Sequence, residues 1–483
     1  MFKKKLYKTY LVVIICYFLI AAAFFLIAGD QLNYRTGQTV MPSALESIGD
    51  LCVGNTVRQP FTVQADQIRR INLITATYDR ENTSTLQLEI YDVDGSLQYS
   101  MQIPMTQLTN GVTTIDFEEP MPINSNEEYE LVFSTPDGYA GNTIALMYGN
   151  SIDLRQGSVP ITIKEEEYVL VNGKELPGKL CAEFEFTQEL MYGRYYWYII
   201  GVLGILLIGY LIYLMKKIEK KESTAILRVV SAFYRYNYLL RQLISRDFKT
   251  KYKRSILGVF WSFLNPLLSM LVQYIVFSAL FKSDIPNFAL YLLIGIVCFN
   301  FFSEAATMAL TSIVGNASLI TKVYVPKYIY PVSRVLSSTV NLLLSLLPLF
   351  AVMILTGAPI NYAILLLPFG LFCLISFSLG VGLCLATAMV FFRDTQFLWG
   401  VVSMLWMYAT PIIYPETIIP EKFMLIFKCN PLYHIVRFIR IIMMDGISPE
   451  PKAYILCLIV SLVPLLIGLF VFKKHQDKFV LNL

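Results

Sequence analysis

The sequence has little charge and almost no histidine. Charged residues make up 15% of the 483 residues, against about 25% in typical soluble domains. Two histidines argue against a histidine-based metal enzyme, and a net charge of +4 gives no indication of nucleic-acid binding. Eight cysteines are too few for a disulfide scaffold of this length. Apolar residues reach 55% with a mean hydropathy of +0.55, which excludes a disordered chain and a purely soluble fold.

Charge-free stretches long enough to cross a bilayer recur along the chain, since a helix needs about 20 apolar residues to do so. They are 11–28, 195–215, 255–281, 285–303, 335–392, 395–415 and 453–472. The fifth stretch is long enough for two helices with a turn at 356–361, so the sequence predicts eight transmembrane helices. The first is interpreted as an uncleaved anchor rather than a signal peptide, because no small-residue cleavage site follows it.

The distribution of lysine and arginine predicts the orientation in the membrane. The N-terminus, residues 216–254 and the tail after residue 472 are basic, which places both termini in the cytoplasm and residues 29–193 outside. Segment 416–452 disagrees with this rule. It falls outside, yet its cations include Lys422, Lys428, Arg437 and Arg440.

Residues 29–193 alternate between apolar and polar residues in five short stretches, 71–78, 85–91, 98–103, 112–117 and 129–134. This period of two, with Asp-Gly and Asn-Gly turns between the stretches, predicts an antiparallel all-β sandwich. Cys52 and Cys181 lie near its two ends and are either a disulfide or two buried thiols. Asp92, Asp94 and Gly95 fit either a calcium loop or a plain hairpin turn.

The remaining chain divides into an anchor at 1–28, a second transmembrane helix at 194–215, a cytoplasmic segment at 216–254 and a six-helix core at 255–483. The cytoplasmic segment is basic and amphipathic, which predicts a helix lying on the inner leaflet or packed on another subunit. Within the core, residues 316–331 form a short cytoplasmic loop. Prolines break the outer segment 416–452, which predicts two short re-entrant or interfacial helices.

Five motifs of this core occur in a fixed order: 246–258 with Trp261 and Asn265-Pro266-Leu267, Asn316 to Pro326, Phe392-Arg393-Asp394, Thr410 to Pro415, and Asn430-Pro431-Leu432. Together they resemble the motifs of polysaccharide-exporting ABC-2 permeases, the membrane subunits that export O-antigen and teichoic acid. The resemblance covers about residues 225–483, and the first 220 residues depart from it. On 75–78 and 86–95, the added outer domain is similar to jelly-roll carbohydrate-binding modules.

The resemblance implies a bacterial cytoplasmic membrane permease that exports a polyprenyl-diphosphate-linked glycan. It implies a homodimer with two ABC ATPase subunits, which would hold ATP and Mg, so that this chain binds no cofactor and is not itself an enzyme. The stretch from Gly173 to Lys179 approaches a Walker A loop but ends in Leu180, where Ser or Thr must hold Mg²⁺. The loop 316–331 is expected to contact the ATPase through Leu319, Lys322, Val323 and Tyr324.

A lipid diphosphate needs cationic donors near the inner interface. Lys249, Lys251, Lys253 and Arg254 are expected at this entrance, unless they serve only to anchor the chain at the inner leaflet. Sugar rings slide over aromatic faces, so we expect a glycan path lined by Trp261, Phe263, Tyr274, Phe299, Phe301, Phe302, Glu304, Trp399, Trp406 and Tyr408. The alternative for each aromatic is ordinary packing or lipid contact, and for Glu304 a helix-packing hydrogen bond.

Three functions remain open at this point. The first is glycan export, with an outer domain that binds the emerging glycan. The second is an ABC-2 exporter of a drug, a peptide or a lipid. The third is a membrane-anchored glycan sensor that signals through residues 216–254. Metal binding and nucleic-acid binding are not expected for any of them.

Overall fold

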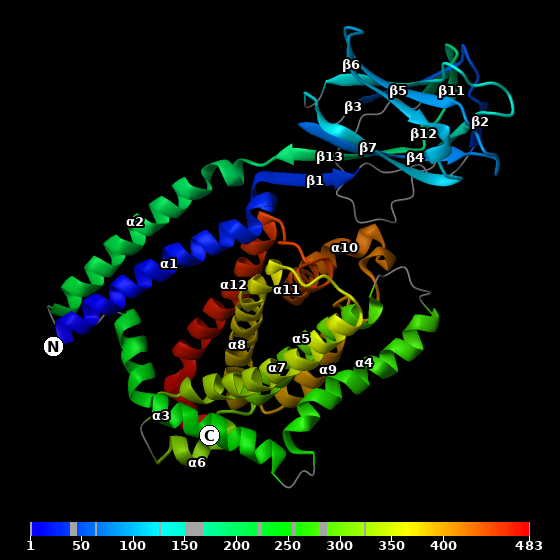
Figure 1. Ribbon diagram of the computed structural model, residues 1–483. Helices are drawn as coiled ribbons and strands as arrows, with labels where there is room; N and C mark the ends of the chain where they lie inside the picture. Colours follow the sequence, from blue (N-terminus) through cyan, green and yellow to red (C-terminus); the bar gives the residue numbers. More distant parts are fainter. Residues whose placement is uncertain are drawn as a thin grey trace. The chain divides into compact units, whose positions relative to one another are not determined.

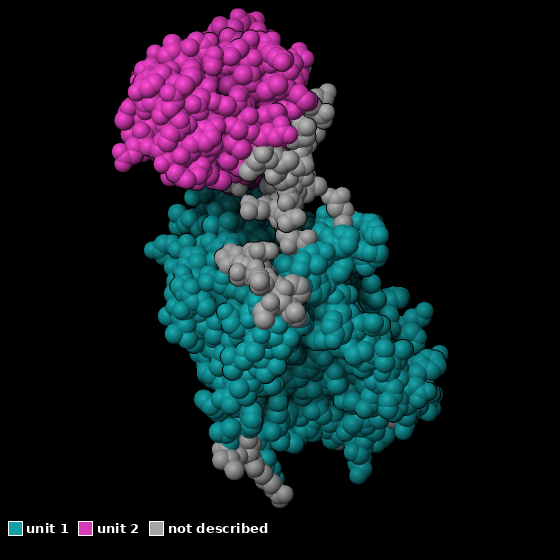
Figure 2. All heavy atoms as spheres, turned by 90° about the vertical axis from the view of Figure 1, so that its right-hand side faces the viewer, with its two compact units in different colours: residues 1–31, 196–483 teal, residues 32–195 magenta. Residues whose placement is uncertain are grey.

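The computed structural model describes residues 2–38, 46–62, 65–124, 127–149, 168–219, 225–253, 257–280, 287–322 and 325–482. The chain divides into two compact units, residues 1–31 with 196–483 and residues 32–195, which Figure 2 shows in separate colours.

The unit 32–195 is built from β-strands (Figure 1). The strands are β1 (Tyr34–Gln38), β2 (Glu46–Asp50), β3 (Thr56–Thr62), β4 (Gln67–Ala76), β5 (Thr85–Asp92), β6 (Leu97–Pro104), β7 (Gly111–Pro122), β8 (Glu128–Ser134), β9 (Ala145–Gly149), β10 (Tyr168–Val171), β11 (Lys174–Pro177), β12 (Lys179–Leu180) and β13 (Ala182–Glu189). A seven-stranded sheet has the order β1-β13-β4-β9-β12, with β2 on β9 and β7 on β4. A six-stranded sheet has the order β11-β10-β3-β8-β5-β6.

The two sheets share one apolar core, which confirms the predicted β-sandwich. Along β5, Leu86, Leu88 and Ile90 are fully buried while the residues between them are partly exposed, because successive side chains point to opposite faces of a strand. Phe61 of the six-stranded sheet stacks on Phe184 of the seven-stranded sheet, with ring centroids 4.5 Å apart. Burial of such alternating side chains between the sheets holds the unit together.

Cys52 and Cys181 are both free thiols in the structure. Cys52 follows β2 and Cys181 follows β12, and both strands pair with Tyr148 of β9. Asp50 of β2 pairs with Ala145 and Leu180 of β12 pairs with Tyr148, so the two cysteines follow residues that pair with different positions of β9. Burial raises the pKa of Cys181 to about 12.

In the turn after β5, the carboxylate of Asp92 accepts hydrogen bonds from within the turn, as in a plain hairpin. Asp92 Oδ1 accepts hydrogen bonds from the backbone amides of Asp94 at 3.1 Å and Ser96 at 2.8 Å. The other oxygen accepts one from Gln98 Nε2 at 2.7 Å. Both oxygens of Asp92 thus have donors within the β5–β6 hairpin, which favours the hairpin turn over a calcium loop.

The other unit is helical. Its main helices are α1 (Phe2–Asn33), α2 (Met191–Glu219), α3 (Ala225–Tyr252), α4 (Trp261–Leu280), α5 (Phe288–Leu310), α6 (Ala317–Ile320), α7 (Ile329–Leu355), α8 (Leu367–Phe391), α9 (Thr395–Tyr408), α10 (Glu421–Lys428), α11 (Pro431–Arg440), α12 (Pro451–His475) and α13 (Phe479–Asn482). Short 3-10 turns precede α4 at Gly258–Phe260 and α8 at Tyr362–Leu366.

Seven helices in the described ranges are long and apolar enough to cross a membrane. The one predicted span outside this set, 395–415, is shorter in the structure: α9 has 14 residues, or about 21 Å, against about 30 Å of bilayer hydrocarbon. The helix ends at Tyr408, before Thr410-Pro411, because proline has no amide hydrogen to continue the helical ladder. The uncharged stretch 395–415 is therefore longer than the helix that it contains.

Helix α5 is the centre of this unit and packs against α4, α7, α8 and α9 (Figure 1). Phe302 of α5 is fully buried in an aromatic cluster with Phe377, Trp399 and Trp406. Helices α1 and α2 are joined by hydrogen bonds from Tyr17 OH to the carbonyl of Ile200 and from Tyr196 OH to that of Ala21. Polar groups inside the membrane need such partners.

Candidate functional site

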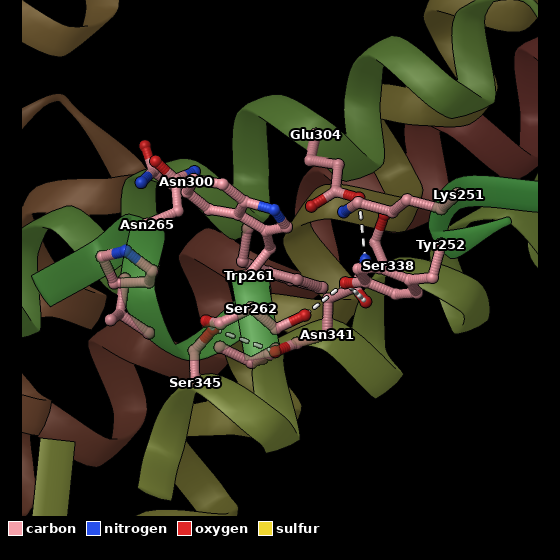
Figure 3. A pocket seen from close by; sticks show the side chains of 14 residues that line it. Lys251, Tyr252, Trp261, Ser262, Asn265, Asn300, Glu304, Ser338, Asn341 and Ser345 are labelled. Atoms are coloured by element: carbon pink, nitrogen blue, oxygen red, sulfur yellow. Dashed lines mark hydrogen bonds and ion pairs between the residues drawn. The ribbon is translucent and has the colours of Figure 1, made fainter. Parts of the chain in front are cut away.

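A cavity of about 300 Å³ lies among α3, α4, α5 and α7 (Figure 3). Uncharged amides and hydroxyls make up most of its polar lining, including Asn265, Asn300 and Ser345, and the indole of Trp261 lies beside them. Lys251 and Glu304 are the charged residues of the lining. We call this space the tryptophan cavity.

Proline opens the backbone of α4 toward this cavity. Pro266 has no amide hydrogen to donate to the carbonyl of Ser262, four residues earlier. The hydroxyl of Ser345 of α7 lies 3.4 Å from that carbonyl oxygen and 3.0 Å from the carbonyl of Asn341, so its single proton is shared between the two. A side chain of a neighbouring helix thus gives the freed backbone group a partial donor, as the membrane interior requires.

An ion pair and a hydrogen-bonded chain connect the four helices. Lys251 Nζ lies 2.7 Å from Glu304 Oε1, and Asn341 Nδ2 donates to the same oxygen at 2.9 Å. Tyr252 OH donates to Asn341 Oδ1 at 3.1 Å and also bonds the hydroxyl of Ser262. A carboxylate in a membrane protein is costly unless paired. Glu304 is therefore more than a helix-packing group: it is the partner of a cation at the cavity wall.

A second cavity, of about 450 Å³, contains Arg246, Asp247 and Arg334 and shares Lys251, Glu304 and Asn341 with the first. We call it the arginine cavity. Asp247 is 4% exposed, and its Oδ1 accepts from Arg246 Nη2 at 3.1 Å and Arg334 Nη1 at 3.0 Å. Its Oδ2 is buried without a partner. This cavity has three cations and two carboxylates, so it favours an anionic ligand.

Of the four cations predicted at the entrance, the structure brings one to the cavities. Lys251 lines both, whereas Lys249 and Lys253 line neither, and all three lysines are exposed. Arg254 lies outside the described residues. Sequence reasoning missed Arg246 and Arg334, as well as the asparagines Asn265, Asn300 and Asn341. A search for amide side chains within the apolar stretches would have found these asparagines, because polar residues inside the membrane mark sites.

The aromatics predicted for the glycan path fall into three groups. Trp261 and Phe301 line the tryptophan cavity together with Glu304. Tyr274 and Tyr408 are exposed, and Phe263 stacks on Phe260 with centroids 5.9 Å apart. The remaining four pack inside the helical unit, mostly in its aromatic cluster: Phe299, Phe302, Trp399 and Trp406.

Trp399 and Trp406 also line a third cavity, of about 360 Å³, together with α8 and α12. Its lining is almost wholly apolar, with Leu385, Pro464 and Ile467 among its residues. The two indole N–H groups have partners elsewhere: Trp399 donates to Thr307 Oγ1 and Trp406 to Asn430 Oδ1. These tryptophans thus present apolar surface, unlike Trp261.

The predicted coupling loop contains the four-residue helix α6. Leu319 is half-buried and packs against an apolar cluster that includes Ile320 and Leu243, while Lys322 is exposed. Val323 and Tyr324 lie outside the described residues. Across the described ranges, no group of three or more His, Cys, Asp or Glu side chains is placed to hold a metal ion.

A unit of long apolar helices with a polar, ion-paired cavity among them has the architecture of a membrane permease. The profile of the ABC-2 type transporter family matches residues 238–444, which include both cavities. The O-antigen export system permease protein RfbA of Klebsiella pneumoniae is 30% identical over 250 residues, 51% of this chain and 96% of that protein. RfbA of Myxococcus xanthus is 29% identical over 52% of this chain and 98% of its own length. The polysialic acid transport protein KpsM of Escherichia coli is 24% identical over 51% of this chain and 97% of its own length.

The chain therefore belongs to the ABC-2 type transporters, among their polysaccharide-export permeases. With its long apolar helices, it is a multi-pass protein of the cytoplasmic membrane. Half of this chain covers nearly the full length of each of these relatives. The β-sandwich lies outside the region that the family profile matches.

Proposed function

We propose that this permease exports a glycan linked to a polyprenyl diphosphate. The tryptophan cavity carries this proposal: one indole face and several uncharged amides and hydroxyls fit a sugar ring, which has apolar faces and a rim of hydroxyl groups. The cations of the adjoining arginine cavity fit the diphosphate. A drug or peptide exporter would have no need for these two chemistries side by side.

The working assembly in this proposal is a homodimer with two ABC ATPase subunits, which hold ATP and Mg. Both termini and α3 lie on the cytoplasmic side, and residues 29–193 lie outside. The loop 316–331 transmits the ATPase movement, with Lys322 exposed for docking and Leu319 anchored in the apolar cluster behind α6. Val323 and Tyr324 belong to the same proposed contact.

The outer β-sandwich, in this proposal, binds the glycan as it emerges. Its resemblance to carbohydrate-binding modules and its exposed tyrosines support this role. Tyr78 and Tyr139 are 45% and 63% exposed, which leaves ring surface for stacking on sugars. Deletion of residues 34–189 should then leave export of the lipid-linked glycan in place and reduce its retention or length at the surface.

Depletion of the protein tests the transport function. Polyprenyl-linked glycan should accumulate inside the cell while surface glycan falls, and the accumulated species identifies the substrate. Unchanged pools would exclude glycan export and favour the small-molecule exporter or the sensor.

A charge reversal tests the coupling loop separately. Lys322→Asp should abolish transport at normal expression, because it reverses the charge of the proposed docking surface. The matched control is Lys474→Asp, an equally exposed lysine near the end of α12. Equal transport by both variants would exclude Lys322 from the ATPase contact.

A further inference from the structure

The Lys251–Glu304 ion pair is part of the wall of both polar cavities. The tryptophan cavity and the arginine cavity share three residues, Lys251, Glu304 and Asn341. Figure 3 shows the two charged head groups next to each other, with Asn341 reaching them from α7. The ion pair therefore lies between the tryptophan cavity, whose other polar groups are uncharged, and the arginine cavity, which has additional cations.

The two carboxylates of the arginine cavity hold their cations differently. Asp247 is 4% exposed and fixed by two guanidinium groups on one oxygen. The side chains of Lys251 and Glu304 are 44% and 31% exposed. A partly exposed ion pair adds little to stability, so its members exchange partners easily. Arg246 is as exposed as Lys251, but its partner Asp247 is buried, whereas Glu304 is partly exposed and keeps the amide of Asn341 when Lys251 leaves, so Lys251 is the cation with the smaller cost of leaving its carboxylate.

Glu304 Oε1 has the donor set of a bound phosphate oxygen. It accepts from an ammonium at 2.7 Å and from an amide at 2.9 Å, which are the distances of charge-assisted hydrogen bonds to oxyanions. An incoming anion would meet the same two donors. The chain itself supplies the anion that these donors hold in the empty permease.

We propose that the Glu304 carboxylate is a substitute for one phosphate group of the substrate. When a polyprenyl-diphosphate-linked glycan binds, Lys251 leaves Glu304 for a diphosphate oxygen in the arginine cavity, and the first sugar lies in the tryptophan cavity. Glu304 keeps the amide of Asn341 as its donor. This inference rests on the proposed function and adds the order of the two ligand groups and the exchange of Lys251.

The exchange explains how the site would release its substrate. Re-formation of the Lys251–Glu304 pair competes with the bound diphosphate and weakens its binding. A transport site must bind well enough to admit the substrate and weakly enough to let it leave. Removal of the competing charge should therefore tighten binding and slow transport.

Binding of farnesyl diphosphate to the purified full-length chain in nanodiscs tests the exchange. Glu304→Gln is nearly isosteric and can still accept from Asn341, and it should lower the Kd about tenfold because Lys251 is released for the ligand. In Glu304→Gln/Lys251→Gln the gain should disappear. Arg241→Gln removes an exposed cation from the same helix and serves as the matched control, with the Kd of the wild type.

Each outcome decides the proposal. A Kd unchanged by Glu304→Gln, a gain that persists without Lys251, or no binding by any variant would overturn the substitute role. The proposed export function would still stand if depletion leads to lipid-linked glycan inside the cell. Inorganic diphosphate and phosphatidylglycerol are the parallel probes. Equal tightening for phosphatidylglycerol would assign the site to a membrane phospholipid and overturn the polyprenyl diphosphate.

Discussion

Replacement of Arg440 by methionine should destabilise the helical unit more than the same replacement of an exposed cation in the same helix. Arg440 lies at the end of α11 and is 5% exposed. It donates from Nη1 to the carbonyl of Pro411 at 2.7 Å, and from Nη2 to those of Ile412 at 3.2 Å and Tyr291 at 3.3 Å. Its guanidinium also lies 3.4 Å from the ring centroid of Tyr291. Pro411 and Ile412 belong to the non-helical segment after α9, whose carbonyls need partners from elsewhere.

The magnitude follows from the three hydrogen bonds to carbonyls that are lost, although the carbonyl of Pro411 keeps Tyr291 OH as a second donor at 3.2 Å. Methionine keeps an apolar stem of similar length and removes every donor. At about 0.6 kcal/mol for each hydrogen bond within a membrane protein, the loss is about 2 kcal/mol. At the value for removing the partner of buried groups, it is about 5 kcal/mol. The expected loss lies between these figures, because removal of the buried charge itself offsets part of the cost.

Arg437→Met is the matched control, three residues earlier in α11. Its side chain is 52% exposed and lies 4.0 Å from Glu416, so its removal should cost about 0–1 kcal/mol. Heating in one detergent, followed by size-exclusion chromatography, gives the midpoint at which each variant loses its monodisperse peak. Arg440→Met should fall several degrees below Arg437→Met. Equal midpoints would refute the stabilising role of Arg440.

Two further experiments test the packing inside each unit, one in the helical unit and one in the β-sandwich. Gly380→Ala should disrupt the contact of α8 with α12, because the added Cβ would lie 2.4 Å from the amide nitrogen of Leu465. Gly201→Ala on α2 is the control with no atom within 4 Å, and equal melting of both would contradict this close packing. In the β-sandwich, native maleimide labelling at pH 8 should modify Cys52 and spare Cys181, whose pKa burial raises to about 12. Rapid native labelling of Cys181 would show that this thiol is not buried.

Local patterns in the sequence predicted five of the thirteen strands that the structure describes, and the long apolar helices. The stretch 98–103 corresponds to β6 and 85–91 to β5, because alternation with a period of two is a property of neighbouring residues. The long apolar helices follow in the same way from runs without charge. The exception is 395–415, where the count of uncharged residues ran past the end of α9 into a proline-broken segment.

The contacts of the site could not be predicted in this way. Lys251 and Glu304 are 53 residues apart in the sequence, and only the packing of α3 on α5 and α7 brings them together. Lys249 has the same charge, but two residues correspond to about 200° of rotation around a helix. It is therefore exposed while Lys251 reaches the cavities. A resemblance in sequence identifies the basic segment, but it does not show which of its lysines lines the cavities.

Tertiary contacts also account for the segment that disagreed with the positive-inside rule. Of the five cations in 416–452, Arg440 is buried on three backbone carbonyls, and Arg437 lies beside Glu416 and donates to Tyr433 OH. The rule concerns cations that would have to cross the membrane as free charges or face its anionic surface. Two of the five are instead bound by the fold, so the segment does not oppose the proposed orientation as strongly as its composition indicates. The same arginine that seemed misplaced in the sequence provides the donors for the carbonyls that the break after α9 leaves without helical partners.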